Sequence, residues 1–274
     1  MKSNINLALK SMLSGCCLLI SSAGFAGTQI IMDVTAPGDK SPKQATMDIQ
    51  NDLMRMETPP EADGEVQPVV IFDAKKQTML MIDHTNKSYF KVDPQTMKQI
   101  KSRMEMMKKQ MEAQMANMPA EQRAMMEKMM KERMPGMQDS DKKKVPHEVR
   151  KTSRSDSAGG YDCQVAEVYR GQKKLREMCV TKWSEIRNGD EVSSAFKGMV
   201  RMMKDFQDSV GQMGGGEDMP FTELEKLGGF PIISTESQGD SKGEVSRVVS
   251  IKDKSFDKTR FEPPKGYRLQ SMMQ

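Results

Sequence analysis

The residues with the most evident chemistry are methionines, whose thioether sulfur suits soft metal ions and whose flexible side chain packs against apolar molecules of variable shape. After residue 26 the sequence contains 27 Met against 6 Leu, and 13 of these Met lie between residues 97 and 137. Spacings of three and four predict a helix with one almost entirely apolar face. The members of this face are Met97, Ile100, Met104, Met107, Met111, Met115 and Met118. The pattern indicates a surface for a hydrophobic molecule.

A second predicted helix, over residues 190–213, combines methionine with aromatic residues. Its apolar face follows the same spacing and contains Val192, Ala195, Phe196, Met199, Met203, Phe206, Val210 and Met213. We expect the two faces to line a groove for a lipid acyl chain or a similar ligand, because burial of apolar surface supplies affinity without directional contacts. The residues expected to line this groove are Met104, Met107, Met111, Met115, Phe196, Met199, Met203 and Phe206.

Three alternatives to this groove stay open. The same faces are compatible with ordinary hydrophobic core, since Met replaces Leu at small cost. They are also compatible with docking on a partner protein of the cell envelope. The third alternative is Cu(I) binding by thioethers, for which Met111, Met115, Met126 and Met130 supply pairs four residues apart. Such a site needs three or four converging donors and no His or Cys lies in this segment, so the sequence predicts no metal and no cofactor.

The sequence contains no recognisable catalytic pattern. Its two histidines, His84 and His147, have no companion at the spacing of a metal site. It has no nucleophile elbow, CxxC pair or phosphate-binding loop. After residue 26 the chain carries 40 Lys and Arg against 38 Asp and Glu, and this balance gives no electrostatic reason to expect nucleic-acid binding. We therefore expect a protein that is not an enzyme.

The first 26 residues have the features of a secretory signal peptide. Lys2 and Lys10 give a basic start, residues 12–20 an apolar stretch, and residues 24–26 a small-residue cleavage site. The apolar stretch is too short to span a membrane, so we expect a periplasmic protein. The alternative is a lipoprotein anchored through Cys16, although apolar residues continue after this cysteine.

Removal of residues 1–26 leaves two cysteines, Cys163 and Cys179, which predict one disulfide in an oxidising compartment. Both lie in a predicted hairpin with strands at 161–169 and 174–182. If Gly171 is the centre of the turn, the cysteines lie directly opposite each other, because each is eight residues away. Directly opposed residues of antiparallel strands are close enough for a disulfide.

Alternating apolar residues and turn signals predict strands before and after the helices. The other expected strands are 28–36, two short strands within 44–57 broken at Asn51-Asp52, then 69–73, 78–83, 88–92, 147–153, 230–237 and 243–253. A Met-rich helical segment is expected over 94–135, interrupted at Pro119, with Asp93 as N-cap and Pro94 at the first position. This order predicts a single α+β domain of residues 27–274, an antiparallel sheet with helices on one face.

Six motifs are spread over most of the chain after residue 26. They are Met79-Leu80-Met81-Ile82-Asp83-His84 with Lys87-Ser88-Tyr89; Pro119-Ala120-Glu121-Gln122-Arg123; Gly160-Tyr161-Asp162-Cys163; Thr181-Lys182-Trp183; Gly229-Phe230-Pro231; and Pro264-Lys265-Gly266-Tyr267. In this order they resemble an uncharacterised family of Met-rich bacterial envelope proteins, a domain of unknown function related to the outer-membrane lipoprotein carrier (LolA-like) superfamily.

The resemblance implies a strongly curved antiparallel sheet, an incomplete barrel, with the Met-rich amphipathic helices on its concave face. Carriers of that superfamily hold lipid or acyl chains in their cavity. The resemblance therefore implies a periplasmic, non-enzymatic carrier whose partner is a lipid or another hydrophobic small molecule. The family supplies no catalytic residues, and the Met-rich segment is longer than the plug helices of a carrier need to be.

Overall fold

The computed structural model describes residues 27–60, 68–119, 121–122, 125, 145–210, 224–238 and 241–271. The predicted signal peptide of residues 1–26, which includes Cys16, lies outside these residues, as do Met126 and Met130 of the alternative metal site. The division of the chain at residue 27 therefore stays a prediction. Within the described residues, no helix is long and apolar enough to cross a membrane.

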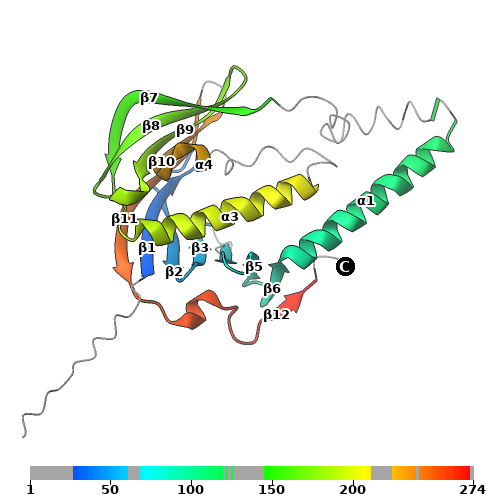
Figure 1. Cartoon of the computed structure of the whole chain (residues 1–274), viewed down its shortest axis with the longest axis horizontal. Helices are drawn as coiled ribbons and strands as arrows, with labels where there is room; N and C mark the ends of the chain where they lie inside the picture. The colour runs from blue at the N-terminus through cyan, green and yellow to red at the C-terminus, as the bar shows by residue number, and fades with distance from the viewer. Residues whose placement is uncertain are drawn as a thin grey trace, which may run out of the picture.

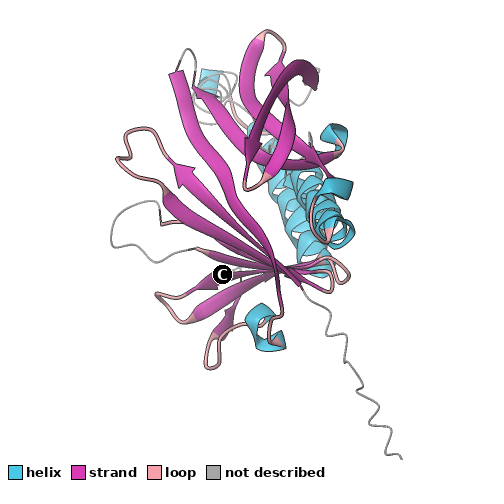
Figure 2. Cartoon of the chain, turned by 90° about the vertical axis from the view of Figure 1, so that its left-hand side faces the viewer, coloured by secondary structure: helices cyan, strands magenta, loops and turns pink. Residues whose placement is uncertain are grey.

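Twelve strands of the described residues form one sheet (Figures 1 and 2), in the order β12-β6-β5-β4-β3-β2-β1-β11-β10-β9-β8-β7. Its first part is a meander of β1 (Gly27–Thr35), β2 (Lys43–Gln50), β3 (Leu53–Glu57), β4 (Val69–Asp73), β5 (Thr78–Asp83) and β6 (Ser88–Val92). Asn51 and Asp52 both have positive φ, 52° and 63°, as a two-residue type I′ hairpin turn requires. The ranges predicted for these six strands are confirmed to within one residue.

The second part of the sheet starts at β11, which pairs with β1, and continues to β7. Its strands are β7 (His147–Ala158), β8 (Tyr161–Arg170), β9 (Lys173–Lys182), β10 (Gly229–Gln238) and β11 (Ser241–Lys254). A short strand, β12 (Arg268–Gln270), pairs in parallel with β6 and was not predicted, because its three residues are all exposed and show no alternation. The sheet is therefore almost wholly antiparallel, and it does not close, since β12 and β7 are its two edges.

Two long helices and three short ones complete the described fold. Helix α1 (Pro94–Ala116) begins as predicted: Pro94 occupies its first position, and the Asp93 carboxylate accepts a hydrogen bond of 2.8 Å from the Thr96 N–H. Helix α3 (Gly189–Val210) begins one residue before its predicted start. The short elements are η2 (Trp183–Glu185), α4 (Leu224–Leu227) and η3 (Lys258–Phe261).

Hydrophobic clusters lie on both faces of the sheet. On one face, Val192, Phe196 and Met199 of α3 pack with sheet residues that include Met54 and Phe72. On the other face, a smaller cluster consists of Val69, Ile71, Ile82 and Phe261. Figure 2 shows α1 and α3 together on one side of the bent sheet. A curved, open α+β sheet is thus confirmed, whereas the placement of the Met-rich helices on its concave face stays a prediction.

The predicted disulfide forms, but the predicted register of its hairpin is wrong. Cys163 and Cys179 are bonded, with their Cα atoms 5.3 Å apart. Cys179 lies opposite Val165 rather than Cys163, because the turn contains two residues, Gly171 and Gln172, and β9 carries an extra residue close to it. The cysteines are therefore diagonal neighbours, which twisted antiparallel strands also bring within reach of each other.

Candidate functional site

The inner half of helix α3 is part of the protein's core. Phe196 and Met199 are 6% and 2% exposed. The Phe196 ring lies 6.0 Å from the Trp183 ring and 5.7 Å from the Phe230 ring, measured between centroids. These are ordinary separations for packed aromatic rings. These two predicted groove residues therefore belong to the packed contact between α3 and the rest of the core. Their contact with a ligand stays a prediction.

The outer half of α3 is more open. Met203 and Phe206 are half-buried and pack at the border of the main core. Helix α1 contacts this helix and also β6, and Figure 1 shows α1 leaving the sheet at β6 and extending away from it. The four predicted groove residues on α1 all follow its first two turns.

Burial along the apolar face of α1 changes from one end to the other. Met97, in its first turn, is buried in the main core. Met104, Met111 and Met115 are half-buried, and Met107 is 57% exposed. The face thus begins as core and continues into an apolar surface that solvent reaches. Surfaces of this kind on soluble proteins often mark binding sites.

The alternative metal site is only partly described. Met111 and Met115 lie on α1 at the expected spacing, whereas Met126 and Met130 lie outside the described residues. Among the residues that the structure describes, no group of three or more His, Cys, Asp or Glu is placed to hold a metal ion. One of the two histidines, His84, has its Nδ1 atom 2.7 Å from the Tyr267 hydroxyl, so it links the β5–β6 turn to the C-terminal segment.

Asp93 fixes the start of α1 to the sheet. A hydrogen-bonded ion pair of 2.9 Å with Lys91 and the hydrogen bond from the Thr96 N–H lower the pKa of this carboxyl from 3.8 to about 2. Lys91 is in β6, so the contact joins the last strand of the meander to the first turn of the helix. The first turn of the Met-rich helix is therefore tied to β6 through Asp93.

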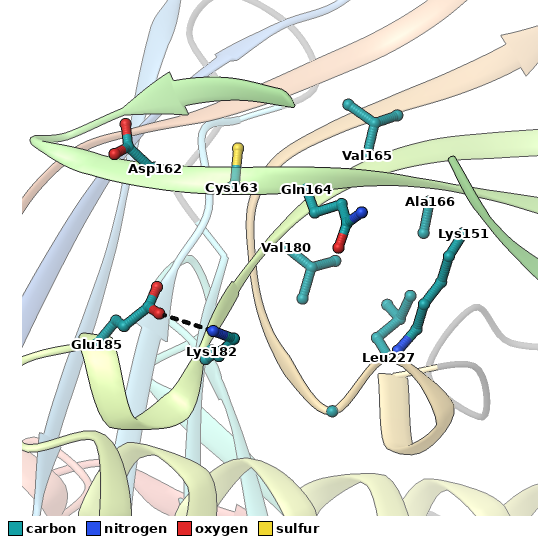
Figure 3. Close-up of a pocket in the computed structure, with 11 residues that line it drawn as sticks. Lys151, Asp162, Cys163, Gln164, Val165, Ala166, Val180, Lys182, Glu185 and Leu227 are labelled. Carbon is teal, nitrogen blue, oxygen red and sulfur yellow. Dashed lines mark ion pairs between the residues drawn. The ribbon is translucent and has the colours of Figure 1, made fainter. Parts of the chain in front are cut away.

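A cavity of about 360 Å³ lies beside the disulfide, between β8, β9 and α4 (Figure 3). Its lining combines apolar residues such as Val165 and Leu227 with Lys151, Gln164 and Lys182. Lys182 pairs with Glu185 at 3.2 Å, and both side chains are largely exposed, so the pair contributes little energy. The lining offers amines and carboxylates but no free thiol, because its cysteine is in the disulfide. We assign no chemistry to it.

A charged cluster lies on the face of the sheet opposite helix α3. Arg260, from η3, contacts the buried Asp48 at 2.8 Å and Glu57 at 2.9 Å, and Arg55 contacts Glu57 at 2.7 Å. Burial opposes ionisation of Glu57, but the hydrogen bond from Arg55 and the charge of Arg260 outweigh it and lower the pKa of this carboxyl. The cluster holds the C-terminal segment on the sheet.

A second cavity, of about 330 Å³, lies next to this segment and was not predicted. Its floor includes Leu53, Ile71 and Leu80. A signal for it exists in the sequence: residues 69–72 and 79–82 are continuous apolar runs, which are typical of strands with apolar residues on both faces. The predicted arrangement, with helices on one face of the sheet, provides a partner for only one of these faces.

Comparison with known proteins gives a family and distant structural likenesses. The model of a family described as a domain of unknown function, DUF4412, matches residues 91–267. No curated protein matches significantly. Among similar solved structures, an uncharacterized conserved protein from Thermus thermophilus is 5% identical, covers 90% of each chain and has a TM-score of 0.42. A LolA superfamily protein from Nitrosomonas europaea is 7% identical, covers 86% of this chain and 90% of its own, and has a TM-score of 0.29. The expected resemblance to an uncharacterised family is confirmed.

Proposed function

Because this chain belongs to the DUF4412 family, whose description leaves its function open, we propose a function from the geometry. We propose that the protein is a non-enzymatic carrier that binds the acyl chain of a lipid along the Met face of α1 and the adjoining end of α3. Met104, Met107, Met111 and Met115 contact the chain from one side, and Met203 and Phe206 contact it from the other. Phe196 and Met199 support this surface from below.

The observation that carries this proposal is the exposure of the apolar face of α1. Met107 is 57% exposed although it lies on the same helical face as the buried Met97. Exposed apolar surface gains about 25 cal/mol per Å² when a ligand covers it. Thioether side chains fit chains of different length and saturation, because they are unbranched and flexible. A row of leucines would give a similar area with less adaptability.

We propose that the carrier works in the periplasm, after removal of residues 1–26. The disulfide between Cys163 and Cys179 supports this location, since disulfides persist in oxidising compartments. A lipoprotein anchored through Cys16 is the alternative. The lipoprotein would begin at Cys16 and the other form at Gly27, so the two differ in mass by residues 16–26 and the attached lipid.

The test is native mass spectrometry of the protein purified from its own cell envelope, followed by titration of the delipidated protein with a fluorescent fatty acid. We expect a bound species of several hundred daltons that organic extraction removes. Mass steps of copper that a Cu(I) chelator removes support the metal alternative instead.

The matched variants use two exposed methionines on different sides of α1. The double substitution Met107→Asp and Met111→Asp places charge on the proposed surface, and we expect it to abolish uptake of the fluorescent fatty acid. Met106→Asp is the control, because Met106 is 65% exposed but lies two residues from Met104, on the other side of the helix. Uptake that survives the double substitution in a folded protein, or that Met106→Asp reduces equally, overturns the proposal.

A further inference from the structure

Strands β3 to β5 present apolar side chains on both faces, and the helices cover only one. The other face carries Leu53 of β3, Ile71 of β4 and Leu80 of β5, and Ile71 pairs directly with Leu80. Residues 255–267, which we call the C-terminal strap, cross this face and contribute Phe256, Phe261 and Tyr267 to its hydrophobic cluster. The strap covers the apolar surface incompletely.

What remains is the cavity of about 330 Å³ between the strap and the sheet. Its apolar part is formed by Leu53, Ile71, Leu80, Phe261 and Pro263. Ile71 and Phe261 are buried, whereas Leu53 and Leu80 are half-buried. The volume is at the lower end of the range for small-molecule sites, about 300–1,000 Å³. It suits one short acyl chain rather than a lipid with two.

Three lysines stand around this apolar floor, together with Asp73 and Glu262. Lys76 pairs with Asp73 at 2.9 Å, and Lys91 pairs with Asp93, also at 2.9 Å. Lys258, in the first turn of η3, is exposed and makes no ion pair within 4 Å with any carboxylate of the described residues. The lining therefore combines an apolar floor with one ammonium group that is available to an anion.

We propose that this cavity binds a medium-chain fatty acid, with its carboxylate at Lys258 and its first methylene groups against Leu80 and Phe261. The site lies on the opposite face of the sheet from the helices and is independent of the proposed carrier surface. Charge-assisted contact with Lys258 selects an anionic head, and the apolar floor selects an acyl chain. Neither feature alone distinguishes a fatty acid from a simple anion or an alcohol.

The experiment is titration of the full protein with decanoate, followed by amide chemical shifts in NMR spectra and by calorimetry. Decanol, which lacks the charge, and acetate, which lacks the chain, are titrated in parallel. We expect decanoate to shift the amides of Leu80 and Phe261, and to bind at least about tenfold more tightly than decanol, the usual effect of one charge-assisted hydrogen bond.

Two variants of exposed strap lysines localise the effect. Lys258→Ala is expected to weaken decanoate binding about tenfold and to leave decanol binding unchanged. Lys265→Ala is the matched control, because Lys265 lies on the strap but does not line this cavity. The proposed carrier surface is tested separately by Met107→Asp with Met111→Asp, which should leave the decanoate shifts at Leu80 in place.

Three results would each overturn the proposal. The first is the absence of decanoate-dependent shifts at Leu80 and Phe261 up to millimolar concentration. The second is equal affinity for decanoate and decanol, which would remove the role of the ammonium group. The third is an equal loss of affinity in Lys258→Ala and Lys265→Ala, which would indicate nonspecific attraction of the anion to the strap.

Discussion

Helices α1 and α3 have the same apolar periodicity, but different surroundings. The face of α3 combines Val192, Ala195 and Phe196, whose different sizes interlock with the sheet, and all three are buried. The face of α1 consists almost entirely of Met and is buried only at its start. Periodicity therefore tells which face of a helix is apolar, whereas the variety of residue sizes on that face tells whether it is packed. A uniform, flexible face is suited to a partner that is not part of the fold.

The largest expected difference between the helices is the effect of truncating a side chain on stability. Phe196→Ala removes a buried ring that contacts Trp183 and Phe230, and should lower the free energy of unfolding by about 3–5 kcal/mol. Met107→Ala should change it by less than about 0.5 kcal/mol. Urea unfolding followed by circular dichroism measures both. Equal losses would mean that α1 is packed as tightly as α3.

The next effect concerns the close approach of α3 to the sheet. A Cβ atom at Gly198 would lie 2.7 Å from the Cβ atom of Ala74 and 3.4 Å from the Phe72 ring. Gly198→Ala should therefore cost about 1–3 kcal/mol through overpacking, partly offset by about 1 kcal/mol of helix propensity. We expect a lower melting temperature.

Ala74→Gly supplies the control for this contact. In the double variant, Gly198→Ala with Ala74→Gly, the contact of 2.7 Å with the Ala74 Cβ atom is absent, so part of the lost stability should return. A double-mutant cycle with no coupling between the two positions would show that α3 can shift away from the sheet at no cost. It would then resemble α1 more than we infer.

The first turns of the two helices should respond to pH in opposite ways, and Asp93 at α1 has the larger effect. Its pKa is lowered to about 2 by Lys91 and the Thr96 N–H. The ionised form thus stabilises the folded protein above the ordinary pKa of 3.8, and this stability is lost as the pH falls toward 2.

Asp93→Ala should lower the free energy of unfolding at pH 7 by about 1 kcal/mol, because an N-cap is lost. Asp93→Asn keeps a capping oxygen but not the charge, so its stability should fall less between pH 5 and pH 2 than that of the wild type. Urea unfolding at a series of pH values measures this. If the free energy of unfolding falls equally with pH in the wild type and in Asp93→Asn, the charge of Asp93 does not stabilise the folded protein.

The smallest effect is expected at Glu191, in the first turn of α3. Partial burial and the nearby Asp52 raise the pKa of its carboxyl, although it accepts a hydrogen bond of 2.6 Å from the Asn51 N–H. A raised pKa in the folded state gives stability that is present below the ordinary value of 4.5 and is lost as the pH rises. Glu191→Gln keeps the acceptor and should stabilise the protein at pH 7 by about 0.3 kcal/mol, after allowance for screening by solvent. A loss of stability would show that the charge favours the fold.

The bounds of most strands and the starts of the long helices could be predicted from the sequence, because apolar runs, turn residues and capping residues determine them locally. The strands from Val69 to Val92 were predicted with their observed bounds, since their apolar runs are separated by short turns. The start of α1 followed from Asp93 and Pro94. The hairpin register differs from the prediction because it depends on a two-residue turn, Gly171 and Gln172, and on an extra residue in β9 that no side-chain pattern marks.

The remaining differences are tertiary. Strand β12 is too short and exposed to have a hydrophobic pattern of its own. It pairs with β6 because the strap, which precedes it, crosses the sheet to that edge. The apolar runs of β4 and β5 signal a second apolar face of the sheet but not the cavity on it, because the two sides of that cavity, Leu80 and Phe261, are far apart in the sequence. The candidate groove was predicted as a set of residues, but periodicity could not separate Phe196, which is core, from Met107, which is exposed.

The pairing of β1 with β11 has a consequence for how the chain reaches its folded state. Gly27 pairs with Lys254, and the pairing continues as far as Thr35 and Val245, with one shift of register between Ile31 and Met32. The meander of β1 to β6 can form from local contacts, but one of its edges stays unpaired until nearly the whole chain is available. Contacts between residues so distant in sequence slow folding, and an unpaired strand edge is a template for association with other chains. We therefore expect newly made chains to depend on a holding chaperone until β11 is available to pair with β1.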